Sequence, residues 1–547
     1  MGDPGSVGAA VSLPPMACDD DRTVLASHGM VCTVDHLASS AGVTVLRAGG
    51  SAADAAVAAS AVLAVTTQNM CGMGGDLFAL VHADGASPAA PADGAAPAAL
   101  AAVGRAGSGA SAARLRADGF DEMPMSGDVR SATVPGCVDG WLALHGRFGR
   151  LPLAEVLAPA REYAVSGFPA SPLLSRAVRR IEGVPGADDY FRSGPVRVGG
   201  MLRRPLLARA FDAIVEGGRE AFYGGEFGAG LIDLGRGLFT ADDLARSCAV
   251  WETPLRVRAW GHDVWTVPPP SQGYLTLAGA RITDGLDLPE DPGDPRWAHL
   301  LSEAARWAGY DRPGVLFDGA DGAALLDEGR LAARREAIDP SARTAPASVT
   351  RPGGTIYLCA ADSDGMGVSL IQSNAAGWGC HLVVPRTGIF LQNRGIGFSL
   401  APGHPAELAP GRRPPHTLAP ALVTDPYGGL TAVLGTQGGD IQPQVVLQLL
   451  ARMLDAGQSP AAAVDAPRWM LGDGGFSTWD DDGPQVTMLE VCAPASWAQG
   501  LTERGHRVVR AEAGANFGHA QAIRVLPDGV LAGAADPRAI TGAASGW

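Results

Sequence analysis

The chain contains no lysine, and all of its basic side chains other than histidine are arginines. Its 42 basic and 57 acidic residues give a formal net charge of −15, which is spread along the sequence instead of gathered in a tail. A chain of this charge is not attracted to polyanions, so we expect neither nucleic acid nor an anionic membrane as a partner. Long apolar runs are also missing, since none approaches the roughly 18 residues that a membrane-spanning helix needs.

Cysteines are few and scattered, and no two of them form a CxxC pair. They are Cys18, Cys32, Cys71, Cys137, Cys248, Cys359, Cys380 and Cys492. This spacing disfavours a structural zinc site and a disulfide framework, and Cys71 is expected to be a small buried residue. The N-terminal stretch MGDPGSVGAAVSLPPMACDDDRT lacks the basic and apolar regions of a signal peptide, which predicts a cytoplasmic protein.

The first part of the chain predicts two helices followed by a strand. Apolar residues within 37–46 share one helical face, and a double glycine ends that helix. Ser51 is a suitable N-cap for a second, alanine-rich helix that runs through Ala64. The glycine turn CGMGGD then leads into the strand LFALVH, and the low-complexity residues 86–99 predict a loop between two strands.

The remainder of the chain divides into a helical and a strand-rich part. From Pro135 to about Ile338 the pattern is mainly helical. Alternation of apolar and polar residues, typical of strands, begins at Thr355 and recurs to the end, interrupted by one helix from Val445 to Gly457. We therefore expect an α+β protein in which helices cover the outer faces of two stacked sheets.

One segment suggests chemistry: residues 353–374, GGTIYLCAADSDGMGVSLIQSN. If the bond between Gly354 and Thr355 is cut, Thr355 acquires a free α-amino group beside its own hydroxyl, so that one residue supplies both nucleophile and base. The alternative is an ordinary strand preceded by a glycine turn.

Many motifs occur in one order along the chain: RAGGSAADAAVAASAVLAV, CGMGGD, ATVPGCVDGW, GRLPLAEVLAPAREYAVSGFP, AFYGG, LFTADDLA, VPPPSQG, EAARWAGYDR, GTIYLCAADSDG, RPPHTLAPALV, LGTQGGD, DAPRW, GHAQAI and GAADPRA. In this order they resemble the γ-glutamyltransferase family over nearly the whole chain. The resemblance implies an N-terminal-nucleophile hydrolase: a four-layer αββα sandwich with additional helices, made as a precursor that cuts itself.

The implied cut lies between Gly354 and Thr355. It would produce a large subunit, residues 1–354, that holds the N-terminal part of the core and the helical region 135–338. The small subunit would be residues 355–547, and the two fragments would form a heterodimer. Whether that unit associates further stays open. The chemistry implied by the resemblance needs no metal and no other cofactor, and the sequence contains no metal-ligand cluster or phosphate-binding loop.

The resemblance also implies catalytic roles. Thr355 matches the family's nucleophile, and its freed α-amine, with a pKa of about 7.7 to 8.0 in model peptides, would accept the hydroxyl proton. Gly438 and Gly439 in TQGGD match the oxyanion hole, where small residues let two backbone N–H groups reach a developing negative charge. By itself that motif would indicate a plain β-turn.

Five further positions match substrate-binding residues of the family. Ser373 and Asn374 correspond to a polar pair near the nucleophile, although one residue is missing from the usual spacing. Arg105 matches an arginine that binds a substrate carboxylate, and otherwise would be a solvated surface group. His416 and Thr417 replace two serines over the substrate. His416 either binds a substrate carbonyl or carboxylate or holds its own loop.

The chain departs from the family where relatives that use glutathione hold the glutamyl ammonium group. An acidic residue is expected there, whereas this chain has Ile396 and Gly397 in QNRGIGFS. We therefore expect a hydrolase or acyltransferase that cleaves an amide or related acyl bond of a small carboxylate-bearing substrate. The alternatives are a true γ-glutamyltransferase or glutathione hydrolase, a hydrolase of a C–C bond next to an oxo-acid, and a catalytically inactive relative.

Overall fold

The structure is a computed structural model that describes residues 22–83, 96–346, 354–472, 486–511 and 517–547. The bond between Gly354 and Thr355 is intact in it, so it represents the uncut chain. Within the described residues, no helix combines the length and the apolar character needed to cross a bilayer.

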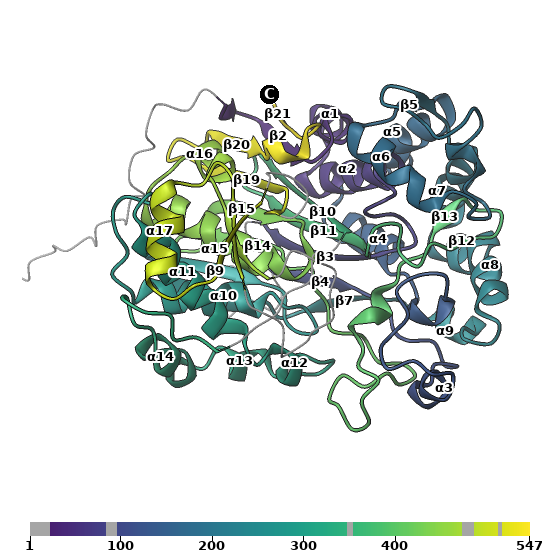
Figure 1. Ribbon diagram of the computed structural model, residues 1–547. Coiled ribbons are helices and arrows are strands. Elements are labelled where there is room, and N and C mark those ends of the chain that lie inside the picture. Colours follow the sequence, from purple (N-terminus) through teal and green to yellow (C-terminus); the bar gives the residue numbers. More distant parts are fainter. Residues whose placement is uncertain (1–21, 84–95, 347–353, 473–485, 512–516) are drawn as a thin grey trace, which may run out of the picture.

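Two antiparallel sheets, each of seven strands within the described residues, form the centre of the molecule (Figure 1). Sheet A consists, in spatial order, of β1 (Val24–Ala26), β20 (Leu531–Ala535), β19 (Ala520–Val525), β15 (Leu430–Thr436), β14 (Ala421–Thr424), β9 (His262–Thr266) and β8 (Leu255–Ala259). Sheet B consists of β21 (Ala543–Gly546), β2 (Gly29–Thr33), β10 (Gly354–Asp362), β11 (Gly367–Ala375), β3 (Asp76–His82), β4 (Ala98–Ala102) and β7 (Ala249–Glu252).

Helices cover the outer face of each sheet, so that the layers follow the order helix, sheet, sheet, helix (Figure 1). Sheet B is covered by α1 (His36–Arg47), α2 (Ala52–Thr66), α4 (Cys137–Phe148), α5 (Leu153–Ser166) and α7 (Pro205–Tyr223). Sheet A is covered by α10 (Tyr274–Asp284), α11 (Pro295–Gly309), α15 (Gln442–Leu450), α16 (Pro460–Asp465) and α17 (Ala495–Glu503). The expected αββα sandwich is confirmed.

Shorter elements surround this sandwich. The helices are α3 (Ala112–Ala117), α6 (Pro172–Ala177), α8 (Glu226–Gly235), α9 (Ala241–Ala245), α12 (Arg312–Val315), α13 (Gly322–Leu325) and α14 (Glu328–Glu336). The strands are β5 (Phe168–Pro169) with β6 (Met201–Leu202), β12 (Val383–Val384) with β13 (Ile389–Phe390), and β16 (Trp469–Leu471) with β17 (Thr487–Glu490) and β18 (Val508–Ala511).

Strand β10 shows why the middle of the sandwich is apolar on both sides. Leu358 and Ala360 belong to the core between sheet B and its helices, whereas Tyr357 and Cys359 belong to the core between the two sheets. This alternation follows from the two-residue repeat of a strand. Tyr357 packs so closely on β15 that a Cβ atom at Gly435 would lie 2.4 Å from its ring, so glycine is required there. The contact sets the position of β10 relative to β15.

The helix α2 begins as the sequence predicts. Ser51 accepts a hydrogen bond from Asp54 N–H, and the Asp54 carboxylate accepts one from Ser51 N–H in return. All of its residues are buried, because their small side chains let the helix lie close against sheet B. Asp362, at the end of β10, accepts a further hydrogen bond from Ala52 N–H at 2.8 Å and so ties the strand to the start of this helix.

Besides the short pair β5 and β6, three strands of the central sheets occur in the region that the sequence predicts to be mainly helical. These are β7, β8 and β9, and they complete one edge of each sheet. Their partners are distant in the chain, since β9 pairs with β14, so local periodicity could not place them. The predicted loop 86–99 is wrong at its end, because β4 begins at Ala98; residues 84–95 lie outside the described residues.

Both sheets combine strands from the two sides of the Gly354–Thr355 bond. In sheet B, β10 and β11 lie between β2 and β3, and β21 pairs with the outer edge of β2. In sheet A, β14 and β15 separate β9 from β19. Two fragments produced by a cut at this bond would therefore share one hydrophobic core.

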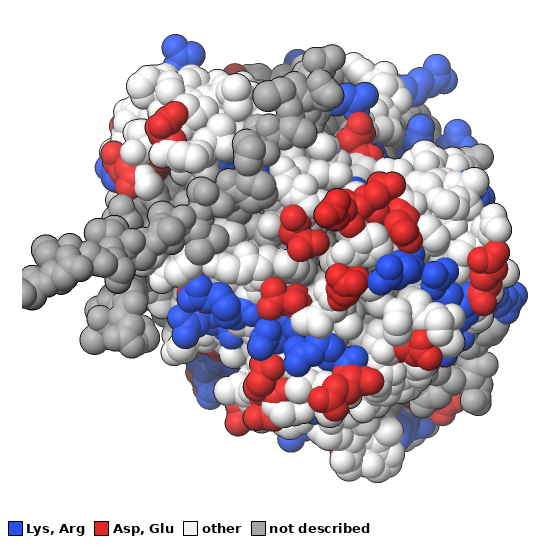
Figure 2. Space-filling view, turned by 90° about the vertical axis from the view of Figure 1, so that its left-hand side faces the viewer, with Lys and Arg blue, Asp and Glu red and all other residues white. Residues whose placement is uncertain are grey.

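Charges of both signs are mixed on the surface. On the face shown in Figure 2, groups of arginine side chains lie next to groups of acidic side chains, separated by uncharged areas. The fields of neighbouring opposite charges largely cancel at distances beyond their separation, and salt screens the remainder over a Debye length of roughly 8 Å at physiological ionic strength.

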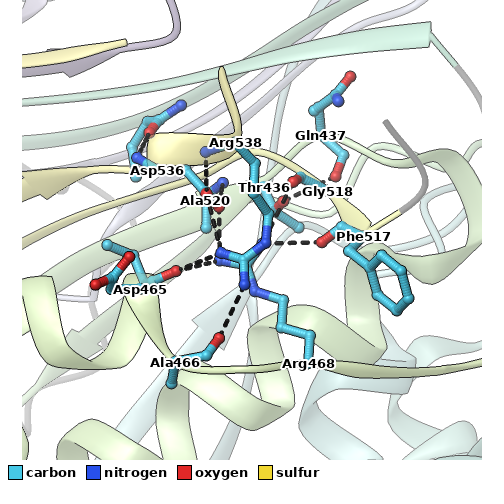
Figure 3. Close-up of polar contacts among 12 residues, drawn as sticks. Thr436, Gln437, Asp465, Ala466, Arg468, Phe517, Gly518, Ala520, Asp536 and Arg538 are labelled. Carbon is cyan, nitrogen blue, oxygen red and sulfur yellow. Dashed lines mark hydrogen bonds and ion pairs between the residues drawn. The ribbon is translucent and has the colours of Figure 1, made fainter. Parts of the chain in front are cut away.

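A buried network of charges supports the end of β15 (Figure 3). Arg468 lies 2.6 Å from Asp536, which also pairs with Arg538 at 3.1 Å. Burial opposes ionisation of Asp536, but the two arginines outweigh it and lower the pKa of its carboxyl. Arg468 also donates to the carbonyl oxygen of Phe517. Two residues further on, the carbonyl oxygen of His519 accepts a hydrogen bond from the backbone N–H of Gln437, which precedes the turn at Gly438.

We predict that Asp536→Ala lowers the free energy of unfolding by about 3–5 kcal/mol, because two buried guanidinium groups lose their shared carboxylate. Denaturant titration followed by tryptophan fluorescence measures the loss. The control is Asp212→Ala, which breaks the exposed Arg161–Asp212 pair and should cost about 0–1 kcal/mol. Similar losses in both variants would contradict the prediction.

Candidate active site

Thr355 lies in a β-bulge at the start of β10. Gly354 pairs with Ala375 and Ile356 pairs with Gln372, so two residues of β11, Ser373 and Asn374, oppose the single Thr355. Bulges redirect side chains and are frequent beside active sites. The bulge sends the two predicted polar residues in different directions.

Ser373 is the member of the pair that contacts Thr355. Its Oγ lies 3.1 Å from Thr355 Oγ1, donates to the carbonyl oxygen of Gly354 at 2.6 Å and accepts from Ala375 N–H at 2.8 Å. Thr355 Oγ1 lies 2.8 Å from the same Gly354 oxygen. Two hydroxyl groups therefore converge on the carbonyl of the bond that the sequence predicts to be cut.

Asn374 is directed away from Thr355. Its amide nitrogen donates to the carbonyl oxygen of Gln68 at 3.1 Å, and its backbone N–H donates to that of Met70. It fastens β11 to the segment after α2, and among the described residues it makes no hydrogen bond with the threonine hydroxyl.

Arg394 is a member of this group that the sequence analysis did not single out. It begins the 3-10 helix Arg394–Gly397, is 3% exposed, and donates from Nη2 to Ser373 Oγ and from Nη1 to Thr417 Oγ1, each at 3.1 Å. Burial lowers its pKa to about 10, while Asp76 and Asp440 act in the opposite direction. The guanidinium is therefore charged at neutral pH. The sequence did hold a sign of its importance, because Arg394 lies two residues before Ile396, where the chain departs from its family.

Asp76 and His416 form a second buried pair. His416 Nε2 lies 3.3 Å from Asp76 Oδ2, and the ring meets Phe78 edge-on. Burial lowers the pKa of His416 well below its ordinary value, and Arg394 and Arg413 lower it further. The imidazole is thus neutral and engaged with Asp76. Of the two interpretations of His416, this contact favours the one in which it holds its loop.

Asp76 connects several segments around Thr355. Its Oδ1 accepts from Gly104 N–H and Gly136 N–H, each at 3.1 Å, and from Gln392 Nε2 at 3.0 Å. Burial raises the pKa of this carboxyl to about 6, although Arg394 and these hydrogen bonds oppose the increase.

Gln272 joins the Thr417 loop to the predicted oxyanion turn. Its amide nitrogen donates to the carbonyl oxygens of Thr417 at 2.8 Å and Gly439 at 2.9 Å. Gly438 and Gly439 are buried and have φ angles of 140° and 63°, which favour glycine. Among the described residues, neither of their backbone N–H groups has a hydrogen-bond partner, so both are available to an anionic oxygen.

Arg105 lies apart from this hydrogen-bonded group. It follows β4 by three residues, is half-buried, and its side chain makes no hydrogen bond or ion pair with another described residue. The neighbouring Gly104 N–H binds Asp76, which brings the Arg105 loop to the same end of sheet B.

The sequence and the structure were compared with those of known proteins. A family model described as Gamma-glutamyltranspeptidase matches residues 38–546. The chain belongs to the γ-glutamyltranspeptidase family. The "Glutathione hydrolase-like YwrD proenzyme" of Bacillus subtilis is 36% identical, over 95% of this chain and 98% of the relative. The "Oxamate amidohydrolase proenzyme" of Klebsiella pneumoniae is 35% identical, over 96% and 99%.

The solved structure of cephalosporin acylase from Bacillus halodurans superposes with a TM-score of 0.86 at 34% identity, over 100% of this chain and 99% of that chain. The protein is thus an acyl-transferring hydrolase of the N-terminal-nucleophile class, as its resemblance to the γ-glutamyltransferase family implied.

In this member of the γ-glutamyltranspeptidase family, a cavity of about 300 Å³ lies against Ile396 and Gly397. Arg312, Pro415, Asp121 and Glu122 are also among its lining residues. Neither Ile396 nor Gly397 offers a charge for a substrate ammonium group. The cavity is large enough for a small organic molecule.

Cys71 is buried, as the sequence predicts, and burial raises the pKa of its thiol to about 12. The thiol is therefore protonated at neutral pH. In the part of the chain that the structure describes, no three His, Cys, Asp or Glu side chains are grouped so that they could hold a metal ion.

We predict a pH-dependent stability difference between the wild type and Asp76→Asn. Because the folded-state pKa of Asp76 is raised to about 6 from 3.8, its favourable contribution is full below about pH 4 and is lost as the pH rises through about 6. The wild type should therefore lose up to about 3 kcal/mol relative to the variant between about pH 4 and pH 7. Thermal melts of both proteins over this range measure the change, and a constant difference in Tm would contradict it.

Proposed function

We propose that this protein cuts itself between Gly354 and Thr355 and then uses Thr355 to hydrolyse or transfer an acyl group of a small carboxylate-bearing substrate. The observation that supports the proposal is the convergence of the Thr355 and Ser373 hydroxyls on the Gly354 carbonyl oxygen. Residues 1–354 and 355–547 would then be the two chains of the active heterodimer.

Self-cleavage follows from this geometry in two steps. Thr355 Oγ1 attacks the Gly354 carbonyl carbon, the Ser373 hydroxyl stabilises the developing oxyanion, and the C–N bond breaks as the proton passes to the Thr355 nitrogen. The resulting ester joins Gly354 to Thr355 Oγ1. Water hydrolyses it, which leaves a carboxylate on Gly354 and the free hydroxyl and amine on Thr355.

The processed enzyme would repeat this chemistry on its substrate. Thr355 Oγ1 attacks the acyl carbonyl and its proton moves to the α-amine, while the oxyanion binds the backbone N–H groups of Gly438 and Gly439. The amine returns the proton to the leaving group as the amide bond breaks. Water, or an amine acceptor, then releases the acyl group from the threonine ester.

We predict that the wild type gives two bands on a denaturing gel, and that Thr355→Ala gives one band and has no amidase activity. Thr355→Ser keeps a hydroxyl and should still be cut, although more slowly, which controls for misfolding. Mass spectrometry of the smaller fragment should place Thr355 at its N-terminus. Cleavage of Thr355→Ala at the same bond would rule out the proposed nucleophile.

Two features support a substrate with a carboxylate and without an amino group beside it. Arg105 has no partner among the described residues, which suits a ligand anion. No carboxylate is present at Ile396 or Gly397 to pair with a glutamyl ammonium group. The amidohydrolase relative is named for oxamate, a substrate that has a carboxylate and no amino group on its acyl chain.

We predict that glutaryl-4-nitroanilide has a higher kcat/KM than γ-glutamyl-4-nitroanilide, by about tenfold, because no carboxylate at position 396 or 397 replaces the hydrogen bonds that the ammonium group makes with water. Arg105→Ala should lower kcat/KM for both compounds. Release of nitroaniline, followed by absorbance, measures the rates. Equal or better use of the glutamyl compound would contradict this substrate assignment.

A further inference from the structure

Resting on the proposed function, we propose that Arg394 binds the substrate carboxylate and thereby selects short acyl groups, in which that carboxylate lies one or two carbons from the scissile carbonyl. The assignment makes Arg394 a specificity-determining residue of the Thr355 site. Arg394 would then bind the carboxylate of short acyl groups, whereas Arg105 would bind that of longer ones.

The partners of Arg394 are the first reason. Among the described residues they are the hydroxyl groups of Ser373 and Thr417, and its Nε has no hydrogen-bond partner there. Among the described residues, no carboxylate forms an ion pair with it; Asp76 and Asp440 act only through their fields.

Several other buried arginines pair with a carboxylate, whereas Arg452 and Arg524, like Arg394, have no ion pair among the described residues. Arg468 and Arg538 pair directly with Asp536, and Arg312 pairs with Asp440 at 3.1 Å. A buried guanidinium without a contacting carboxylate carries a desolvation cost that a bound anion would reduce. Arg394 is therefore prepared for a ligand carboxylate, which it could bind through two N–H groups.

The distance to the nucleophile is the second reason. Ser373 Oγ lies 3.1 Å from both Arg394 Nη2 and Thr355 Oγ1, so these two atoms are no more than about 6 Å apart. A carboxylate oxygen needs about 2.8 Å to the guanidinium, and a reactive carbonyl carbon needs about 3–3.5 Å to the nucleophile. Little length remains for the carbon chain between these two groups.

The position of the carbonyl in the uncut chain supports the same conclusion. The Gly354 oxygen lies 2.6 Å from Ser373 Oγ, which places it within about 6 Å of Arg394 Nη2 as well. An acyl carbonyl that replaces Gly354 would stand equally close to the guanidinium. Each further methylene adds about 1.3 Å to an extended chain. A five-carbon diacid would have to fold back or place its carboxylate elsewhere, and Arg105, whose side chain has no ion pair among the described residues, offers a second position.

The experiment uses the processed wild-type enzyme and five compounds: the mono-4-nitroanilides of oxalic, malonic, succinic and glutaric acid, and neutral acetyl-4-nitroanilide. We expect kcat/KM to be highest for the oxalyl or malonyl compound and to fall about tenfold or more towards the glutaryl compound. Hydrolysis that depends on Thr355 but is fastest for the glutaryl compound would overturn the assignment. No hydrolysis of any compound would instead refute the proposed function.

Variants separate binding from general damage. Arg394→Gln should lower kcat/KM for the oxalyl compound about ten- to a hundredfold, and that for acetyl-4-nitroanilide less than about threefold. Arg394→Lys keeps the charge without the fork and should lie between wild type and Arg394→Gln. The matched variant Arg105→Gln should reduce use of the glutaryl compound more than that of the oxalyl compound.

Equal loss on the charged and neutral compounds in Arg394→Gln would show a merely structural arginine and overturn the proposal. Gel analysis and circular dichroism establish that each variant is cut and folded. If Arg394→Gln is not cut, the proposal is tested with the wild-type enzyme instead, by the series of acyl chain lengths and by competitive inhibition with free oxamate and free glutarate. Weaker inhibition by oxamate than by glutarate would likewise overturn it.

Discussion

The position of β10 between β2 and β11 is the constraint on which the rest of the site depends. Backbone pairing on both sides, and burial of both faces, hold the strand in the middle of the sandwich. The bulge opposite Thr355 is formed by the next strand of the same sheet, and Tyr357 fixes the distance to β15, which leads to Gly438. A chain cut at the start of β10 would retain these contacts, because each fragment supplies strands to both sheets.

Burial gives the polar groups around Thr355 their chemical properties. In a water-poor interior, a charge is stabilised or destabilised by the few groups that touch it. The same burial raises the pKa of Asp76 and lowers that of His416, and among the described residues Arg394 has hydroxyl groups as its side-chain hydrogen-bond partners. The neutral His416 holds its loop, whereas the charged Arg394 is the group that we propose to bind an anion. Binding of a carboxylate there would place its neighbouring carbonyl beside the proposed nucleophile.

Prediction from sequence succeeded where a local pattern carries its own physical cause. Ser51 caps α2 because Asp54 follows three residues later, and the apolar alternation after Thr355 does form strands. It did not identify β7 and β9, whose partners β4 and β14 lie far along the chain, or the adjoining β8. At the site, the sequence identified Ser373 and Thr417 as candidates. It did not identify Arg394 or Asp76, because no sequence pattern shows that these two residues are buried near those hydroxyl groups.

Local chemistry therefore decides which bond is the candidate for cleavage, which glycines can adopt positive φ angles, and that the usual acidic residue is absent at Ile396 and Gly397. These properties belong to residue types and to their immediate neighbours. Folding alone decides that Ser373 faces Thr355 while Asn374 turns to Gln68, and that Arg394 stands about 6 Å or less from the threonine hydroxyl. Such contacts join segments from different strands and loops, and their energies exist only once water has been excluded between them.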